Sequence, residues 1–245
     1  MSSSDHRHFS RRSFLICAGT AVADLALAGM PLAASAAGAM KIGIIGSGRI
    51  GGTLGELWLK AGHQVMFSSL DLEHDKTLAA HLGGAAQAGT PRQAGAFGEV
   101  LLISVPYAAL PQLGRDLGEL LAGKIVLDTC NPIPARDGEM ALDAKAKGSG
   151  IASPLLLPGA HLVRAFNSVG YSKLQSEAHR SGERIAIPLA ADDAAALQIA
   201  VRLVQDAGFD AVVVGGLARA KEFDPGTPVF GKALTAAELR QGLGL

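Results

Sequence analysis

From about residue 40 onward, short apolar runs alternate with segments in which apolar residues recur at helical spacing. Runs rich in β-branched and aliphatic residues are typical of buried strands. They cover residues 41–45, 64–67, 98–106, 123–128, 162–167, 184–190 and 210–215. Helices are predicted over 50–61 and 75–83, and a third is expected between the capping pair Asp192-Asp193 and Gly208. This alternation predicts an α/β fold with a doubly wound, mainly parallel sheet. It is expected to form one compact domain over residues 40–245, with a short C-terminal extension.

The turn after the first predicted strand has the pattern G-x-G-x-x-G. It reads Gly46-Ser47-Gly48-Arg49-Ile50-Gly51 and lies between that strand and the first predicted helix. A strand, glycine turn, helix and second strand within about 30 residues are typical of a dinucleotide-binding unit. Gly46 would permit the tight turn, Gly48 would let a pyrophosphate approach the backbone, and Gly51 would let the helix pack closely on the strand. The helix N-terminus would supply amide donors to the phosphates.

The end of the second strand bears on which dinucleotide is bound. NAD sites usually have an acidic residue there, whereas this strand ends in Ser68-Ser69-Leu70, with Asp71 and Glu73 beyond it. Hydroxyl groups without a carboxylate suit the 2′-phosphate of NADP, and Arg49 could pair with that phosphate or cover the adenine. The alternative reading of the two serines is ordinary turn chemistry that caps the next helix. NADP is therefore expected rather than NAD.

Three later strands end in residues that suit a ligand site. Ligands of doubly wound sheets bind at the carboxyl ends of the strands. The segments in question are Ser104-Val105-Pro106-Tyr107, Asn131-Pro132 and Asn167-Ser168. Residues 133–150, which follow the second of them, show no clear hydrophobic period, so a mobile loop is expected there.

Residues 1–36 are interpreted as a signal peptide rather than as part of the fold. A polar, charged start precedes a mildly apolar stretch that ends in small residues such as Ala34-Ser35-Ala36. The segment Ser10-Arg11-Arg12-Ser13-Phe14-Leu15 resembles a twin-arginine export signal. It predicts a periplasmic or extracytoplasmic protein with no stable membrane span after cleavage; an ordinary signal peptide and an uncleaved anchor are the alternatives.

Composition narrows the function classes. Lys and Arg together number 22, as do Asp and Glu, so the formal net charge is zero and nucleic acid is not an expected partner. The two cysteines, Cys17 and Cys130, cannot form a disulfide framework, and no metal-ligand spacing is present, so no metal site is predicted. A small-molecule electron acceptor is the expected partner, and a homodimer is compatible with the sequence.

No set of acid and base residues for catalysis stands out, so no catalytic residue is predicted. His63 and His81 lie at ends of predicted helices, and Cys130 is expected to be a small buried residue. Tyr171 and Lys173 have Tyr-x-Lys spacing, whereas the short-chain dehydrogenase pair requires Tyr-x-x-x-Lys. Hydride transfer between a nicotinamide and a flavin-like ring mainly requires two stacked rings rather than a proton donor.

The chain resembles the NADPH-dependent reductases of the deazaflavin coenzyme F420 and the reductase domain of six-transmembrane metalloreductases. The segments that carry the resemblance are KIGIIGSGRIGGTLGELWLKAGHQVMFSS, LLISVPY, IVLDTCNP, VRAFNSVG and GLARAKEF. It implies a Rossmann fold in which residues 47–50 hold the pyrophosphate and Ser69 holds the 2′-phosphate. It further places Val105 and Pro106 along the cofactor and Ala165 and Phe166 beside the nicotinamide. The chain departs from the family pattern at Leu70 and His74, where basic residues are usual.

Together, these observations predict an NADP(H)-dependent oxidoreductase that transfers a hydride between nicotinamide and a deazaflavin or flavin co-substrate. The cofactor-binding residues are expected to include Asn131 as well as the glycine turn, both serines and the residues that the resemblance implies. A non-catalytic NADP-binding sensor or carrier is one alternative. An imine reductase of the pyrroline-5-carboxylate type is the other. That type needs a long helical C-terminal domain, whereas the residues after Asn167 are expected to form strands and a helix.

Overall fold

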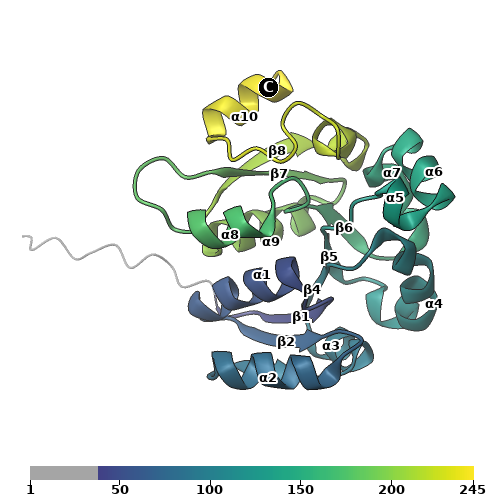
Figure 1. The fold of residues 1–245 in the computed structure, drawn as a ribbon, viewed down its shortest axis with the longest axis vertical. Coiled ribbons are helices and arrows are strands. Elements are labelled where there is room, and N and C mark those ends of the chain that lie inside the picture. The colour runs from purple at the N-terminus through teal and green to yellow at the C-terminus, as the bar shows by residue number, and fades with distance from the viewer. Residues whose placement is uncertain (1–37) are drawn as a thin grey trace, which may run out of the picture. The chain divides into compact units, whose positions relative to one another are not determined.

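The fold is built around one eight-stranded sheet with helices on both faces (Figure 1). The structure is a computed structural model that describes residues 38–245, so the predicted export signal lies outside the described residues. The strands are β1 (Lys41–Ile45), β2 (Gln64–Ser68), β3 (Ala86–Ala88), β4 (Val100–Ile103), β5 (Ile125–Asp128), β6 (His161–Arg164), β7 (Ala186–Ala191) and β8 (Asp210–Gly215). The helices are α1 (Arg49–Lys60), α2 (Leu72–Leu82), α3 (Pro91–Phe97), α4 (Leu110–Leu121), α5 (Pro134–Asp137), α6 (Glu139–Lys147), α7 (Ser149–Leu156), α8 (Tyr171–Glu177), α9 (Ala194–Asp206) and α10 (Ala236–Leu243), with 3₁₀ helices η1 (Tyr107–Ala109) and η2 (Leu217–Phe223).

The strand order is β3-β2-β1-β4-β5-β6-β7-β8. Strands β1 to β6 pair in parallel throughout, so their carboxyl ends meet at one edge of the sheet. The order reverses direction between β1 and β4, which is the point where doubly wound sheets bind ligands. The predicted doubly wound, mainly parallel sheet is confirmed.

One strand pair runs the other way. Strand β7 pairs antiparallel with β6 through Val163↔Ala191 and Arg164↔Ala190, and β8 is parallel to β7. The carboxyl ends of β7 and β8 therefore point away from the edge at which β1 to β6 end.

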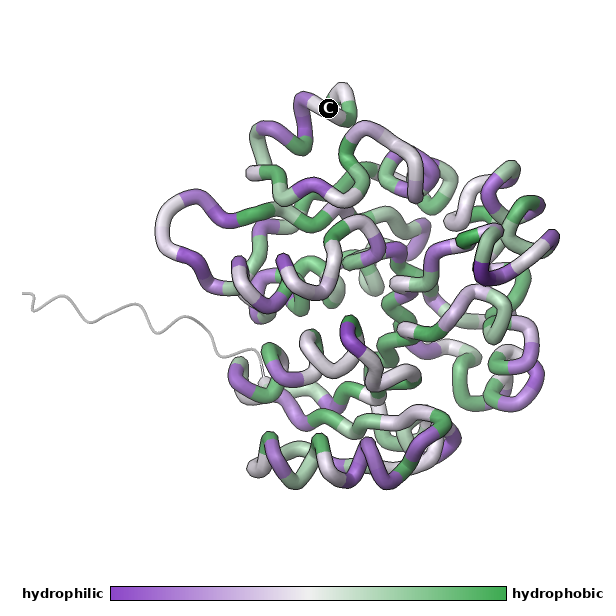
Figure 2. The backbone as a smooth tube through the Cα atoms, in the orientation of Figure 1, coloured by the Kyte–Doolittle hydropathy of each residue, from purple (hydrophilic) through white to green (hydrophobic). Residues whose placement is uncertain are grey.

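Side chains of the central strands alternate between two cores, as the pleat of a strand requires. Ile42 and Ile44 face the core under α1, α8 and α9, whereas Leu101 and Ile103 face the core under α4, α6 and α7. Figure 2 shows the hydrophobic segments concentrated along the strands and the hydrophilic ones in the outer turns and helices. A third, smaller core lies among β7, β8, η2 and α10.

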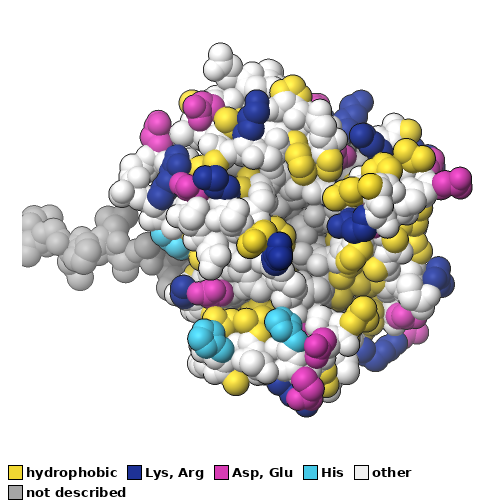
Figure 3. All heavy atoms as spheres, viewed as in Figure 1, with side chains coloured by type: hydrophobic (Ala, Val, Ile, Leu, Met, Phe, Trp, Pro, Cys, Tyr) yellow, Lys and Arg dark blue, Asp and Glu magenta, His cyan; other side chains and the backbone are white. Residues whose placement is uncertain are grey.

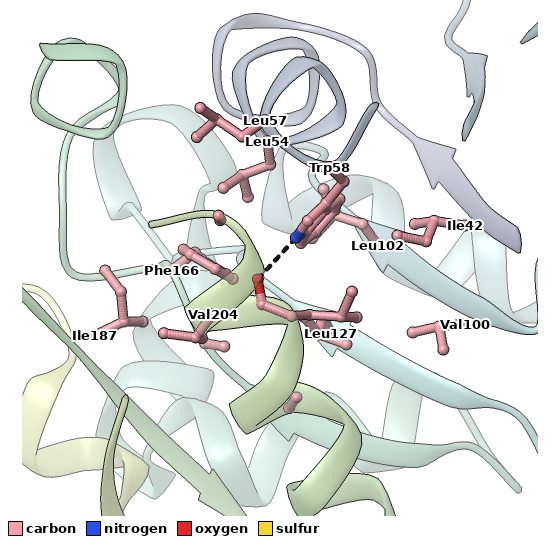
Figure 4. Close-up of a cluster of buried hydrophobic side chains, with 14 of the residues drawn as sticks. Ile42, Leu54, Leu57, Trp58, Val100, Leu102, Leu127, Phe166, Ile187 and Val204 are labelled. Atoms are coloured by element: carbon pink, nitrogen blue, oxygen red, sulfur yellow. Dashed lines mark hydrogen bonds between the residues drawn. The ribbon is translucent and has the colours of Figure 1, made fainter. Parts of the chain in front are cut away.

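The largest buried side chain, Trp58, joins α1 to α9. Its indole Nε1 donates to the carbonyl oxygen of Leu203 at 2.8 Å, and its ring meets that of Phe166 edge to face with 6.0 Å between centroids. Figure 4 shows both side chains among Leu54, Leu127 and other buried aliphatic groups. A buried indole N–H needs a partner, and this one fixes the spacing of the two helices.

Residues 133–150 are not the irregular loop that the sequence pattern predicted. They form α5, α6 and the start of α7, separated by Gly138 and Gly148, both at positive φ. These helices are too short to give a clear hydrophobic period, which explains the wrong prediction. Exposed apolar side chains such as Leu142 and Leu155 lie on them, and Figure 3 shows hydrophobic side chains gathered where Figure 1 places α5–α7.

Within residues 38–245, no helix has both the length and the apolar character needed to span a membrane.

Candidate cofactor site

The glycine turn after β1 is shaped by contacts at two of its glycines and by open space at the third. Gly46 has φ of +102°, and a Cβ there would lie 2.2 Å from the carbonyl oxygen of Ser104. A Cβ on Gly51 would lie 2.1 Å from the carbonyl oxygen of Gly46. A Cβ on Gly48 would meet no atom within 4 Å. The fold thus requires glycine at positions 46 and 51, whereas Gly48 borders space that a ligand can approach.

Helix α1 begins at this turn without a side-chain cap. Its N-cap, Gly48, contributes no side-chain hydrogen bond, and no acidic residue lies in the first turn. The amides of Gly46 and Ser47 donate to the Ser68 carbonyl oxygen at 2.8 and 3.1 Å, which anchors the turn to β2. The first amides of a helix lack intrahelical partners and carry partial positive charge, so this end of α1 suits a phosphate group.

The two serines at the end of β2 have different surroundings. The Ser68 hydroxyl is fully buried and donates to the Ile44 carbonyl oxygen at 2.6 Å, so its side chain braces β1 and does not face the predicted cofactor position. The Ser69 hydroxyl donates to the Asp75 carboxylate at 2.9 Å, and Ser47 donates to the other oxygen of the same carboxylate. Asp75 is fully buried.

Arg49 lies at the first position of α1, but its guanidinium stacks on the ring of Tyr171, 4.9 Å from the centroid. Tyr171 begins α8, which packs against α1. Among residues 38–245, Arg49 has no ion pair with a carboxylate. The predicted pairing of Arg49 with a 2′-phosphate would therefore require its side chain to leave Tyr171.

The predicted nicotinamide end lies beyond β4, β5 and β6. Val105 and Pro106 follow β4, and the Val105 amide contacts the buried Cys130 thiol at 3.5 Å. The Asn131 side chain donates to the Asn167 carbonyl oxygen at 2.7 Å, which joins the segments after β5 and β6. These strand ends meet at one edge because the three strands are parallel and adjacent.

Phe166 has an unusual backbone and a buried side chain. Its φ is +57°, a conformation that is uncommon outside glycine and is found where the surrounding structure enforces it. The ring is 1% exposed and packs between Trp58 and Phe209. The side chain of Phe166 thus belongs to the core, so it is the main chain of this residue that lies at the edge where the nicotinamide is expected. Only the main chain of Ala165 and Phe166 is placed at the strand end.

A buried ion-pair network of Arg164, Asp128 and Asp224 lies beside the carboxyl ends of β5 and β6. The Arg164 guanidinium is fully buried and lies 2.8 Å from Asp128 Oδ2 and 3.3 Å from Asp224 Oδ1. It also donates to the carbonyl oxygens of Asp128 and Cys130 at 3.2 and 2.9 Å. Burial lowers the Arg164 pKa, but the two carboxylates outweigh that effect and raise it, so the group stays cationic. The network joins β5, β6 and the segment after η2.

Burial keeps two groups near this edge, Cys130 and Tyr107, in their neutral forms. Burial is the main reason that the pKa of Cys130 is raised well above its usual value, and it raises the pKa of Tyr107 to about 12. His63 is also buried, where its Nδ1 accepts from the Met40 amide at 3.1 Å and its Nε2 contacts Asp206 at 3.0 Å. The expectation that Cys130 is a small buried residue is confirmed, and His63 has a structural role.

The sequence interpretation missed three buried charged residues that border or support the candidate site, namely Asp75, Arg164 and Asp224. Asp75 was overlooked because it lies six residues beyond Ser69, whereas the usual acidic position is at the strand tip. The sequence offered one indication of its position: Asp75 lies four residues after the N-cap residue Asp71, which places its side chain in the first turns of α2. Arg164 and Asp224 are 60 residues apart, and no local pattern could have paired them.

The comparisons with known proteins agree with this geometry. Residues 41–132 match the family model of coenzyme F420-dependent NADP oxidoreductases. No curated protein shows significant sequence similarity to the chain.

Three solved structures illustrate the likeness of fold. A hypothetical protein from Sinorhizobium meliloti superposes with a TM-score of 0.71 at 23% identity, covering 81% of this chain and 96% of its own. A candidate F420-dependent NADP reductase from Arthrobacter sp. FB24 gives 0.65 at 21%, covering 74% and 87%. An imine reductase variant from Myxococcus stipitatus in complex with NAD⁺ gives 0.53 at 20%, covering 84% of this chain and 61% of its own.

The predicted resemblance is therefore confirmed over residues 41–132, where the family model of NADP oxidoreductases matches, and the three solved structures share the fold of the chain. The protein is a Rossmann-fold chain whose residues 41–132 match the model of the coenzyme F420-dependent NADP oxidoreductases.

Proposed function

We propose that the protein is an NADP(H)-dependent oxidoreductase that transfers a hydride between nicotinamide and a flavin-like acceptor, either a deazaflavin or a flavin. The observation that carries the proposal is the glycine turn at the switch point of the sheet. There, the open side of Gly48 and the uncapped N-terminus of α1 lie together within the region that matches the family model. The residues present fit a dinucleotide pyrophosphate.

In this proposal, the chain's own residues bind the cofactor and orient the two rings, and none of them acts as an acid or a base. When bound, reduced nicotinamide supplies the hydride, and the acceptor ring takes it up together with a proton from solvent. Val105, Pro106 and the main chain of Ala165 form an uncharged edge on which a flat ring can lie. Cys130 and Tyr107, whose pKa values are raised by burial, keep their protons at neutral pH and take no part as acids or bases. Transfer between stacked rings depends on orientation and distance, which a rigid edge provides.

The binding step is tested by Gly48→Ala, with NADPH titrated by fluorescence. The added methyl group occupies the space in front of α1, so the affinity should fall at least about tenfold, or 1.4 kcal/mol. Gly118→Ala in α4 is the matched control, because its Cβ also meets no atom within 4 Å but lies in another helix. The proposal fails if the wild-type protein does not bind NADPH, or if both variants bind it equally well.

The acceptor is tested by adding flavin mononucleotide or the deazaflavin to the NADPH complex. Oxidation of NADPH that depends on either ring supports the proposal. Tight binding without oxidation by either ring favours the sensor or carrier alternative. Oxidation only with a cyclic imine favours the imine reductase alternative.

Export is part of the same proposal. The twin-arginine segment at Arg11-Arg12 would carry a folded protein across the membrane, so that NADP(H) bound before export could travel with it.

A further inference from the structure

The carboxylate of Asp75 lies beneath the position where the proposed cofactor's adenosine would be bound. Asp75 belongs to the first turns of α2, and its side chain is fully buried between the glycine turn and the end of β2. One carboxylate oxygen accepts from the Ser47 hydroxyl and the other accepts from the Ser69 hydroxyl at 2.9 Å. A single buried carboxylate thus holds both serines that border this corner of the site.

No cation balances that carboxylate within the described part of the chain. Its neighbour Lys76 pairs instead with Glu73 at 2.7 Å, and Arg49 is stacked on Tyr171. The side chain of Leu70, directly after the serines, is fully exposed and carries no charge. Asp71 and Glu73 add further negative charge to the start of α2. This corner of the site therefore has a local excess of negative charge.

The substituent at the adenosine 2′ position is the group that meets the end of the second strand in this fold. A 2′-hydroxyl is neutral and needs only hydrogen bonds. A 2′-phosphate carries nearly two negative charges and requires donors, but the Ser47 and Ser69 hydroxyls already donate to Asp75. Turning them toward a phosphate would leave a buried carboxylate unpaired, close to a group of like charge.

We propose that Asp75 is a specificity-determining residue: by holding Ser47 and Ser69 and placing a negative charge beneath them, it weakens binding of the 2′-phosphate so that the site accepts NADH as well as NADPH. This inference rests on the proposed function, because it concerns the same cofactor site. The protein would then use both NADPH and NADH, because the Asp75 carboxylate weakens the binding of NADPH relative to that of NADH.

The test compares dissociation constants for NADPH and NADH in the wild-type protein and in Asp75→Asn. Asparagine keeps the shape of the side chain and can still hydrogen-bond to both serines, but it removes the charge. The wild-type affinities should lie within about tenfold of each other. In the variant, the NADPH-to-NADH affinity ratio should rise by about tenfold or more, since like charges a few ångströms apart repel by more than 1 kcal/mol. A purely structural role would weaken both cofactors together and leave the ratio unchanged.

Glu73→Gln is the matched control, because it removes one negative charge from the same helix turn at an exposed side chain that is paired with Lys76. Its ratio should change by less than about threefold, since exposed charges are screened. If Asp75→Asn does not fold, the wild-type protein is titrated with adenosine 2′,5′-bisphosphate and with adenosine 5′-monophosphate, which differ only in the 2′-phosphate. The bisphosphate should bind no more than about tenfold more tightly.

A wild-type preference for NADPH, or for the bisphosphate, of more than about tenfold would overturn the inference. So would an unchanged ratio in Asp75→Asn, although NADPH binding would still uphold the proposed function. If neither cofactor binds to the wild-type protein, the proposed function and this inference fail together.

Discussion

Replacing Arg164 with methionine removes the one cation from a buried network of two carboxylates. The side chains of Arg164 and Asp128 are fully buried, and that of Asp224 is 10% exposed. Methionine has a similar length and fills most of the same space, so the change chiefly removes charge and hydrogen bonds. Asp128 and Asp224 would then be left without their counter-ion below the edge that joins β5 and β6.

The size of the effect follows from that arrangement. Breaking a buried pair by removing one partner costs about 3–5 kcal/mol of folding free energy. In a domain of this size, each kcal/mol lowers Tm by roughly 2–4 °C, so Arg164→Met should lower it by about 6–20 °C. The double variant Asp128→Asn with Arg164→Met should recover a large part of the loss, because one of the uncompensated charges is also removed.

Urea unfolding of the wild type, both variants and Lys145→Met measures these differences. Lys145 is exposed on α6, and its replacement should change stability by less than about 0.5 kcal/mol. The midpoint of unfolding should fall in Arg164→Met while the dependence on urea stays the same. A loss below about 1 kcal/mol, or a double variant no more stable than the single one, would show that the network does not stabilise the fold.

Three further changes probe other parts of the molecule. Gly51→Ala should destabilise the fold by at least about 1–3 kcal/mol in thermal unfolding, because its Cβ would overlap the Gly46 carbonyl oxygen; a stability equal to that of the wild type would contradict this packing. The Cys130 thiol should react with a thiol reagent at pH 8 only after unfolding, because burial raises its pKa and keeps it protonated; rapid labelling of Cys130 itself in the native protein, located by peptide mapping, would contradict that assignment. Replacing Arg11 and Arg12 with lysine should retain the protein in the cytosol, as judged by cell fractionation, and unchanged export would exclude the twin-arginine route.

The sequence pattern predicted the parts of the fold that are locally determined. Strands β1 and β5 were correctly expected because a buried parallel strand is a short continuous apolar run. The glycine turn was recognisable because its glycines stand at a fixed local spacing, although the contact that requires glycine at position 46 comes from the distant Ser104 carbonyl oxygen. The antiparallel pairing of β7 could not be read from the sequence, since a fully buried strand has the same composition in either direction.

The site was predicted less completely than the fold. The pattern identified Ser69 but not Asp75, the buried group that holds it, because the partnership depends on how α2 packs beside the glycine turn. Phe166 was expected beside the nicotinamide from the resemblance, and the sequence could not tell that its left-handed backbone turns the ring into the core and leaves only the main chain at the edge. Which way a side chain faces at a strand end is set by tertiary packing, and single-sequence patterns carry little information about it.

The position of Asp224 bears on whether the region matched by the family model could fold without the rest of the chain. Strands β7 and β8 end away from the site, and η2 brings the chain back so that Asp224 reaches Arg164 and the Ser149 amide. The region matched by the family model ends at residue 132 and contains Asp128 but neither of its network partners. In a fragment limited to that region, Asp128 would have no counter-ion at the edge where the ligand is expected. Residues 41–132 are therefore not expected to be stable when moved into another protein without residues 164–224. The last third of the chain supplies the charge that balances Asp128.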